Sequence, residues 1–541
     1  MDGLMQDYPL TLSHLVGRAE RLFSRVPIAS RSATGMTRYT YGEMCRRVHR
    51  LAHVLTKLGV RRGDRVGSFA WNSHRHLELY LAVPSFGAVL HTINIRLFAE
   101  QISYVINHAE DAILFVDDSA LAAIEPLAAQ LRSVRAYVVL SDGPVPETSL
   151  TPVFGYEDLL REAPESFPFP SLDENDAAGM CYTSGTTGNP KGVVYSHRAL
   201  FLQSMAQAMV DGFGVSERDT VLSIVPMFHA NGWNLPYSAT MVGAAQVYPG
   251  AHPLPEDIAR LIQDERVTVA AGVPTVWLGV LGVLEHKEYD LSSLRCAPCG
   301  GSAVPPSLIE AYDKRGVRIV QAWGLTETAP LATVSVPRKH MESWSPERLV
   351  AIRAKQGRIL PALEIRAVDD SGNEVPWDGK SVGELQVRGP WVIRSYYNDP
   401  RSQDAFADGW FRTGDVASID SDGYVQITDR AKDVVKSGGE WISSVELENA
   451  IMGHPKVFEA AVIGLPHEKW QERPLACVVT KPGQTLTKKE LYDFLADKFA
   501  KWWLPEDIVF VDSVPKTSVG KFAKRELRER FKEYHWPRHS E

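Results

Sequence analysis

Short apolar runs alternate with helix-like stretches along residues 1–430, and this alternation limits the possible folds more than any other feature of the sequence. A predicted strand at residues 65–71 is followed by a predicted helix at residues 74–86. Strands that alternate with helices usually form parallel sheets with helices on both faces. The sequence therefore predicts an α/β fold with two parallel, helix-covered sheets. The other strands are expected at residues 89–94, 112–118, 136–141, 220–225, 245–248, 267–271 and 317–322.

The pattern changes twice in the rest of the chain. Short strands separated by turn residues predict a small antiparallel, barrel-like subdomain at about residues 384–430. After this, helices and strands predict a compact α+β unit. We therefore expect a large N-terminal domain, residues 1–430, and a small C-terminal domain, residues 431–541. The C-terminal unit is expected to contain helices at residues 444–452 and 488–500 and strands at residues 457–463, 475–479 and 508–511.

The composition is that of an ordinary globular protein, with 44% hydrophobic residues and a net charge of −8. This balance argues against a nucleic-acid partner, because binding nucleic acid needs a basic face. The uncharged run at residues 267–284 contains Pro274 and three glycines, so we expect a strand, a turn and a buried helix there rather than a membrane span. The N-terminus lacks a signal-peptide pattern, and we expect a soluble, cytoplasmic protein.

Five scattered cysteines do not predict a disulfide framework. Cys296 and Cys299 have the spacing of half a zinc site or a redox pair, but no second pair follows. A metal or redox role is therefore not favoured, and the sequence does not decide whether the two thiols have any role.

Residues 183–192 (TSGTTGNPKG) carry the strongest local signal in the chain. They include three glycines, four hydroxyl side chains and Lys191, and a predicted strand lies on either side. Glycines allow close backbone approach, and hydroxyls, amides and a lysine bind phosphate oxygens, so the loop is predicted to hold a polyphosphate. It is not a Walker A loop, because Pro190 stands where that motif needs its second glycine. The alternative is a solvated hairpin loop.

The loop matches Ser/Thr-Ser/Thr-Gly-Thr-Thr-Gly-x-Pro-Lys-Gly at every position, and further motifs follow in order over nearly the whole chain. On these motifs the chain resembles the adenylate-forming superfamily of acyl-CoA synthetases, peptide-synthetase adenylation domains and luciferases of the beetle type. It is most similar to bacterial medium- and long-chain fatty acyl-CoA synthetases. The resemblance implies an N-terminal domain that binds ATP and an acid, and a mobile C-terminal domain with an adenylation lysine and a CoA-binding face. It also implies phosphate contacts from Lys191, Thr183 (which would also bind Mg²⁺), Ser184, Gly185, Thr186, Thr187 and Gly188.

A second motif, residues 321–327 (QAWGLTE), follows a predicted strand. Taken alone, such a string is usually a strand end or a helix cap. The resemblance implies that Trp323 lies against adenine, that Thr326 binds phosphate and that Glu327 holds Mg²⁺. Tyrosine is more common in the family where this chain has Trp323, but the stacking surface is kept. Further nucleotide contacts are implied for Gln321, Ala322, Gly324, Gly301 and Ser302.

The next implied contacts lie on both sides of the predicted domain boundary. Asp415 is implied to accept both ribose hydroxyls, which suits the two oxygens of a carboxylate. Lys432 stands at the hinge position of the family, and Gly438 and Gly439 are implied to line the CoA channel. The alternative for this segment is a glycine turn flanked by surface lysines. The other implied nucleotide or CoA contacts are Ile427, Arg430, Lys432, Lys436 and Trp441.

Lys521 lies in the C-terminal segment PKTSVGK, and the resemblance implies that it is the adenylation lysine. A cation placed between the acid's carboxylate and the α-phosphate orients both anions and stabilises the charge that develops during attack. Lys516 lies in the same segment and is the alternative.

Residues 225–233 (VPMFHANGW) give the best indication of the acid. The resemblance implies that His229 lies where the acyl tunnel meets the nucleotide site, that Trp233 gates the tunnel and that Ala230 faces the nucleotide. A histidine packed in the core is the alternative. No acidic residue in this stretch would pair with a substrate amine, which argues against amino acids. A medium-chain fatty acid is favoured, and a short sulfur-containing acid such as 3-methylthiopropionate remains open.

These motifs predict an AMP-forming acyl-CoA synthetase, an acid–thiol ligase that uses ATP, Mg²⁺ and coenzyme A. The acid would attack the α-phosphorus to form acyl-AMP and pyrophosphate; the C-terminal domain would then swing about Lys432, and the CoA thiol would displace AMP. Three alternatives remain open: a non-thioester enzyme of luciferase type, a peptide-synthetase adenylation module, and a nucleotide-binding regulator without turnover. The sequence ends at Glu541 without a carrier domain, so the module is not expected. The resemblance also favours a homodimer.

Overall fold

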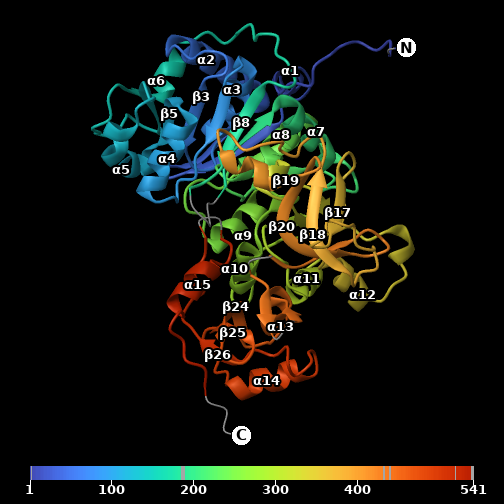
Figure 1. Cartoon of the computed structure of the whole chain (residues 1–541). Coiled ribbons are helices and arrows are strands. Elements are labelled where there is room, and N and C mark those ends of the chain that lie inside the picture. Colours follow the sequence, from blue (N-terminus) through green and yellow to red (C-terminus); the bar gives the residue numbers. More distant parts are fainter. Residues whose placement is uncertain (2, 184–188, 431–432, 438–439, 518–519, 538–541) are drawn as a thin grey trace.

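The computed structural model describes the chain except for residues 2, 184–188, 431–432, 438–439, 518–519 and 538–541. Two large sheets dominate the N-terminal part, with helices packed around them, as predicted (Figure 1). One sheet has the strand order β7-β6-β5-β3-β4-β8-β9, formed by β3 (Arg65–Phe69), β4 (Val89–Thr92), β5 (Asp111–Asp117), β6 (Ala136–Leu140), β7 (Val153–Gly155), β8 (Ala177–Tyr182) and β9 (Gly192–Ser196). The other has the order β12-β10-β11-β1-β2, formed by β1 (Pro27–Ser32), β2 (Gly35–Thr40), β10 (Thr220–Ser223), β11 (Ala245–Tyr248) and β12 (Val269–Ala271).

The two large sheets are mixed, whereas the sequence predicted wholly parallel sheets. β2 runs antiparallel to β1, and β9 runs antiparallel to β8. Only residues 33–34 join β1 to β2, and residues 183–191 join β8 to β9. A parallel connection needs a crossover of a dozen or more residues, so these short links allow only antiparallel pairing.

The predicted helix at residues 74–86 is α3 (His74–Phe86). The Ser73 hydroxyl caps its start by accepting a hydrogen bond from the His76 N–H, and Gly87 ends it with a φ of 92°. α3 contacts β4 and β8 of one sheet and β1 of the other, so it is buried between them. The other N-terminal helices are α1 (Ser13–Leu22), α2 (Tyr41–Lys57), α4 (Ala99–Ala109), α5 (Leu121–Ile124), α6 (Tyr156–Arg161), α7 (His197–Ala208), α8 (Leu235–Val242), α9 (Pro255–Asp264), α10 (Pro274–Leu284), α11 (Pro306–Asp313) and α12 (Pro346–Arg353).

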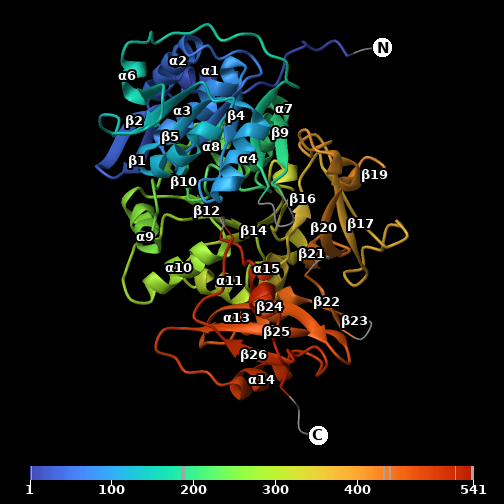
Figure 2. The same ribbon diagram turned by 60° about the vertical axis from the view of Figure 1, so that its left-hand side comes forward.

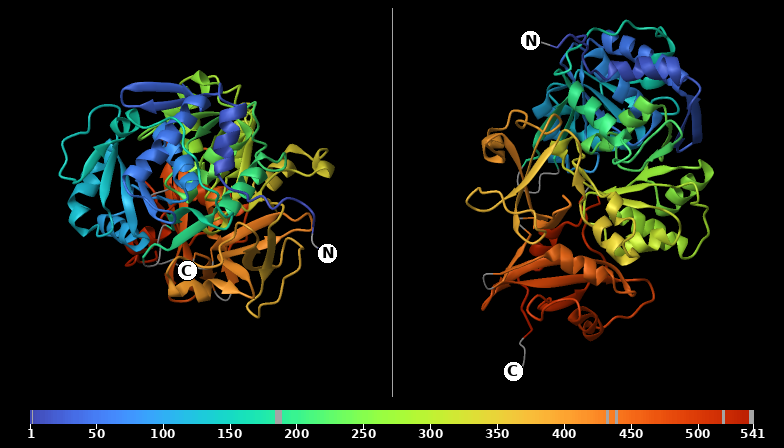
Figure 3. Two further views of the ribbon diagram at one scale, coloured as in Figure 1. Left: turned by 90° about the horizontal axis from the view of Figure 1, so that it is seen from above. Right: turned by 90° about the vertical axis from the view of Figure 1, so that its right-hand side faces the viewer.

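Two smaller sheets complete the N-terminal part. One is formed by β13 (Ala297–Gly300), β14 (Ile319–Trp323), β15 (Thr333–Val334) and β16 (Arg358–Ile359). The other is the predicted antiparallel sheet, shown in orange in Figure 3, and it also includes β17, which lies before the predicted start at residue 384. Its strands are β17 (Glu364–Val368), β18 (Val382–Arg388), β19 (Phe406–Ala407), β20 (Trp410–Ile419) and β21 (Val425–Arg430).

The C-terminal part is a sheet covered on both faces, which lies below the rest of the molecule in Figure 2. Alternate residues of β24 face opposite sides: Val462 packs with α13 and α14, and Ile463 packs with α15. This matches the predicted α+β pattern. The elements are β22 (Val435–Ser437), β23 (Glu440–Ile442), α13 (Ser444–Met452), β24 (Val457–His467), β25 (Gln471–Thr480), α14 (Lys488–Ala496), β26 (Asp507–Phe510) and α15 (Lys524–Arg530).

The uncharged run at residues 267–284 folds as expected. It forms β12, a turn and α10, and the Trp277 side chain of α10 is fully buried. Among the helices of the described residues, none is both long and apolar enough to cross a membrane.

Candidate active site

A cavity of about 860 Å³ lies between the ends of the N-terminal strands and the loop that carries Lys521. A second cavity of about 520 Å³ adjoins it, and both are lined by Trp323, Arg430 and Lys521. Folding therefore brings most of the predicted site residues to one place. The first cavity is lined by Thr183, Lys191, His229, Ala230, Trp233, Gly301, Ala322, Trp323, Gly324, Thr326, Glu327, Arg430 and Lys521, and the second adds Ser302, Gln321, Asp415 and Ile427.

The base of the predicted phosphate loop is closed by hydrogen bonds between its two ends. The Thr183 N–H donates to the Lys191 carbonyl at 3.0 Å, and the Lys191 N–H donates to Thr183 Oγ1 at 3.2 Å. These bonds hold Lys191 at the wall of the cavity. The predicted phosphate contacts Ser184, Gly185, Thr186, Thr187 and Gly188 lie outside the described residues.

Asp415 is held between two other predicted nucleotide residues. Trp323 Nε1 donates to Asp415 Oδ2 at 2.9 Å, and Arg430 Nε lies 3.0 Å from Asp415 Oδ1. β20 and β21 place Asp415 directly opposite Arg430, and the carboxylate is almost fully buried. Because each carboxylate oxygen has two lone pairs, Asp415 is oriented and can still accept hydrogen bonds from a ligand.

Two other predicted residues shape the wall. Gln321 Oε1 accepts a hydrogen bond from the Val304 N–H at 3.1 Å, so its amide supports the segment after β13. A Cβ on Gly324 would lie 1.6 Å from the Pro330 carbonyl oxygen, so only glycine allows the chain to pass there.

Glu327 is fixed at both its main chain and its side chain. The Ile393 N–H donates to the Glu327 carbonyl at 3.0 Å, and the Tyr396 hydroxyl donates to Glu327 Oε1 at 2.7 Å. Neighbouring Thr326 is buried, and its carbonyl accepts a hydrogen bond from the Tyr195 hydroxyl at 2.6 Å. This leaves Glu327 Oε2 for a ligand in the cavity.

Lys521 reaches the cavity from the C-terminal part. Its Cε would lie 3.2 Å from a Cβ on Gly301, and the Thr275 hydroxyl donates to the Gly520 carbonyl at 3.3 Å. Burial, together with the charge of Arg430, lowers the pKa of Lys521 to about 8, against the opposing effects of Asp415 and Glu327. Lys516, the alternative, instead pairs with Glu459 at 2.8 Å.

His229 lines the first cavity, and its imidazole is neutral. Burial, with a smaller effect of the Lys521 charge, lowers the pKa of His229 to about 3. A neutral imidazole can both donate and accept a hydrogen bond, but it cannot pair as a cation with a carboxylate.

Trp233 lies in a left-handed turn of the backbone. The five residues from Ala230 to Asn234 all have positive φ, from 35° at Ala230 to 61° at Asn234. Such a turn is costly for residues with a side chain, so tertiary contacts must hold it. Gln207 donates to the Trp233 carbonyl at 2.6 Å, and Asn234 donates to the Ser204 hydroxyl at 2.7 Å. Trp233 Cη2 would lie 3.4 Å from a Cβ on Gly300.

Among the remaining predicted residues, only Lys436 is described at a position away from the two cavities. Lys436 is exposed on β22 and lines neither cavity. Lys432, Gly438 and Gly439 lie outside the described residues, and Trp441 is described only as part of β23. Cys296 and Cys299 are buried free thiols, and burial raises the pKa of both.

Sequence reasoning missed several lining residues. Tyr396 bonds to Glu327, and Gln356 Oε1 accepts a hydrogen bond from the Ile427 N–H at 2.6 Å. Arg401 pairs with Asp399 and donates to the carbonyl of Asn189 in the phosphate loop at 3.4 Å. No local pattern at residue 356 or within residues 389–402 marks these residues, because the contacts that bring them to the site are to residues far away in the chain.

Two family models match this chain. The model for the AMP-binding enzyme matches residues 23–397, and the model for the AMP-binding enzyme C-terminal domain matches residues 446–521. The chain belongs to the AMP-binding enzyme family. The predicted boundary after residue 430 falls between the two matches, and its position stays a prediction.

Members of the AMP-binding enzyme family resemble this chain over nearly its whole length. The long-chain-fatty-acid–CoA ligase of Thermus thermophilus is 49% identical over 98% of this chain and 97% of that protein. The medium-chain-fatty-acid–CoA ligase of Ectopseudomonas oleovorans is 45% identical over 98% of each. The 3-methylmercaptopropionyl-CoA ligase of Ruegeria lacuscaerulensis is 45% identical over 98% of this chain and 99% of that protein.

Among solved structures of similar proteins, the anthranilate CoA ligase AuaEII in complex with anthranoyl-AMP has a TM-score of 0.88 and 26% sequence identity. The match covers 98% of this chain and 99% of that chain. The predicted α/β class with a smaller C-terminal unit is therefore confirmed.

Proposed function

We propose that this member of the AMP-binding enzyme family is an acyl-CoA synthetase. It forms acyl-AMP and pyrophosphate from ATP and a carboxylic acid, and then transfers the acyl group to coenzyme A with release of AMP. One observation carries the proposal: Lys521 enters the cavity lined by Lys191 and Glu327. A cavity that gathers these groups suits a triphosphate and a carboxylate.

In the first half-reaction, a carboxylate oxygen of the acid attacks the α-phosphorus, and the bond from that phosphorus to pyrophosphate breaks. Lys521 lies between the two anions, orients them and stabilises the charge in the transition state. Lys191 and the other polar groups of residues 183–192 bind the β- and γ-phosphates. Asp415 accepts the ribose hydroxyls, and Trp323 lies against the adenine. Because His229 is neutral, it contributes hydrogen bonding and shape.

The residues present fit Mg²⁺, which usually takes one or two protein carboxylates together with substrate phosphates and water. Glu327 offers Oε2, since Oε1 is bound by Tyr396, and Thr183 lines the same cavity. No group of three or more His, Cys, Asp or Glu that could hold a metal occurs among the described residues, so the donor set suits an ion shared with a nucleotide rather than an all-protein site. When bound, Mg²⁺ would neutralise phosphate charge.

In the second half-reaction, the CoA thiol attacks the acyl carbonyl carbon, AMP leaves and the thiol proton is lost. We propose that the C-terminal part turns about Lys432 between the two half-reactions and carries Lys521 out of the cavity. The face carrying Gly438 and Gly439 then replaces the Lys521 loop. In both orientations the C-terminal part closes the cavity, which keeps water away from the mixed anhydride of acyl-AMP.

The proposed acid is a medium-chain fatty acid. Apolar side chains form part of the cavity lining, namely Phe213, Ile224, Val225, Ile258, Val273 and Val276. Residues 225–233, which include the lining residues His229 and Trp233, contain no acidic residue to pair with a substrate amine. Relatives named for fatty acids support this proposal, and the relative named for 3-methylmercaptopropionate keeps that short sulfur-containing acid as the second candidate.

Pyrophosphate release with acids of about three to sixteen carbons, including 3-methylthiopropionate, tests the proposal, with and without CoA. We expect rapid release with medium chains and acyl-CoA formation only when CoA is present. Acyl-AMP without a CoA-dependent product would indicate an enzyme of luciferase type, and nucleotide binding without pyrophosphate release would indicate a regulator. The homodimer and the cytoplasmic location stay predictions from the resemblance; light scattering during gel filtration tests the first.

A further inference from the structure

Lys191 and Glu327 carry opposite charges and line the same cavity. Without a ligand, such groups tend to pair, because their attraction is strong where water is partly excluded. Across the residues that the structure describes, no ion pair joins the two, and each group instead contacts Tyr396. An ion pair between Lys191 and Glu327 would occupy both groups before a nucleotide arrived.

Tyr396 lies between them. The Lys191 ammonium lies 4.4 Å from the centre of the Tyr396 ring, while the Tyr396 hydroxyl donates to Glu327 Oε1 at 2.7 Å. One side chain therefore holds the cation over its ring and the anion at its hydroxyl. A tyrosine phenol is protonated at neutral pH, so the Tyr396 hydroxyl acts as the donor to Glu327.

The loop around Tyr396 is attached to both motifs. The Tyr397 N–H donates to the Gly192 carbonyl at 2.9 Å, next to Lys191, and the Ile393 N–H donates to the Glu327 carbonyl at 3.0 Å. The Tyr396 N–H itself donates to the Ser402 hydroxyl at 2.9 Å. The ring is 7% exposed, so it has little freedom to move away from either group.

We propose that Tyr396 is a positioning residue that keeps Lys191 and Glu327 apart and correctly oriented for an incoming nucleotide and its Mg²⁺. The inference rests on the proposed function. The Lys191 ammonium can exchange the ring face for phosphate oxygens, which bind a cation more strongly than a ring does. Glu327 keeps Oε2 turned to the cavity because Oε1 is already bound.

Two substitutions separate the two contacts. Tyr396→Phe keeps the ring under Lys191 and removes only the bond to Glu327, whereas Tyr396→Leu removes both. Tyr397→Phe is the matched control in the same loop, since among the described residues the Tyr397 hydroxyl forms no hydrogen bond and its ring contact with His108 is kept.

Binding of ATP without acid is measured by calorimetry over a series of MgCl₂ concentrations. For Tyr396→Phe, we expect about a tenfold rise in the Mg²⁺ concentration that gives half-maximal binding, and an ATP affinity at saturating Mg²⁺ within about threefold of wild type. For Tyr396→Leu, we expect both quantities to worsen by at least about tenfold, and Tyr397→Phe should match wild type.

An unchanged Mg²⁺ requirement in Tyr396→Phe would overturn the inference, as would equal losses in the Phe and Leu variants. Thermal unfolding of each variant shows whether the fold is kept. Because Tyr396→Phe retains the buried ring, the Mg²⁺ requirement of this variant is the deciding measurement. If the wild-type protein bound no ATP at any Mg²⁺ concentration, the proposed function itself would fail, which is a distinguishable result.

Discussion

At the scale of single residues, Lys521 is a cation in a cavity that disfavours its charge. Burial lowers its pKa to about 8, and neighbouring Arg430 acts in the same direction. A buried ammonium of this kind gains most when an anion arrives, because the anion replaces the water that the cation lost. The environment that weakens the charge in the free protein thus makes it a strong ligand for phosphate and carboxylate.

The pH dependence of the first half-reaction follows from this pKa. Only the protonated amine stabilises the transition state, so kcat/KM for pyrophosphate release should fall as pH rises through about 8, the lowered pKa of Lys521. The measurement is the initial rate at low ATP from about pH 6 to pH 10, compared with acyl transfer from supplied acyl-AMP. A flat profile through pH 8 would contradict the role assigned to the charge.

Replacing Lys521 with alanine should separate the two half-reactions. We expect pyrophosphate release to fall by at least about a hundredfold, because an electrostatic contact to the transition state is lost. Transfer from supplied acyl-AMP to CoA should stay within about threefold of wild type. Lys532→Ala, which changes an exposed lysine of the same C-terminal part, is the control. Equal loss of both half-reactions would contradict the division of roles.

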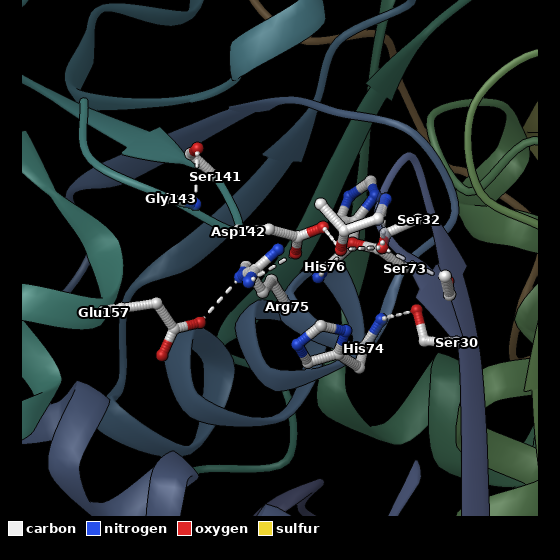
Figure 4. Close-up of polar contacts among 12 residues, drawn as sticks. Ser30, Ser32, Ser73, His74, Arg75, His76, Ser141, Asp142, Gly143 and Glu157 are labelled. Carbon is white, nitrogen blue, oxygen red and sulfur yellow. Dashed lines mark hydrogen bonds and ion pairs between the residues drawn. The ribbon is translucent and has the colours of Figure 1, made fainter. Parts of the chain in front are cut away.

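At the scale of elements, a charged network joins three N-terminal helices. Arg47 of α2 bonds to Glu78 of α3 at 2.7 Å and to Glu157 of α6 at 2.9 Å. Figure 4 shows the next link, in which Arg75 of α3 lies between Glu157 and Asp142, at 2.7 and 2.9 Å. Because Glu78 is fully buried, its charge depends on Arg47 for compensation.

Arg47→Met should therefore destabilise the N-terminal part. The change leaves a buried carboxylate without its cation, and such a loss costs about 3–5 kcal/mol. Denaturant unfolding followed by tryptophan fluorescence measures the change. Arg161→Met, which breaks an exposed pair with Asp158 on α6, serves as the control and should cost no more than about 1 kcal/mol. Similar losses in both variants would show that burial of Glu78 does not set the cost.

At the scale of the whole molecule, a few contacts around Asp429 hold the C-terminal part where Lys521 reaches the cavity. The Ser444 N–H donates to Asp429 Oδ2 at 2.8 Å, and Lys524 of α15 donates to the Ser444 hydroxyl at 2.6 Å. The Ser443 hydroxyl also donates to the Thr428 carbonyl. The bonds from Ser444 to Asp429 and from Ser443 to Thr428 cross residues 431–432, so a turn of the C-terminal part about this point would break them.

Asp429→Asn should weaken this placement. Loss of the charge removes the favourable interaction with Lys524 and weakens the bonds from Ser444, so the first half-reaction should slow by about tenfold. Transfer of acyl from acyl-AMP to CoA should change by less than about threefold, because it uses another orientation. Single-turnover rates of both half-reactions provide the measurement.

The matched control for this change is Asp408→Asn, an exposed residue whose φ of 49° suits asparagine. An equal slowing of both half-reactions by Asp429→Asn would indicate general damage rather than a shift between two orientations.

The features that depend on neighbours along the chain could be predicted from the amino-acid sequence. Ser73 and Gly87 set the limits of α3, and the predicted helix at residues 444–452 is α13 (Ser444–Met452). Caps, turns and periodic patterns act over a few residues, so they can be recognised without the fold. The phosphate loop and the motif at residues 321–327 were recognisable for the same reason, since each is continuous in the sequence.

Features that depend on residues far apart in the chain became visible only in the folded protein. Lys516 and Lys521 lie in one segment, but Glu459 neutralises the first while the second enters the cavity. Tyr396 has no local signal, and its place between Lys191 and Glu327 exists only after three distant segments meet. Such contacts arise from packing and long-range electrostatics, which no short pattern of residues encodes.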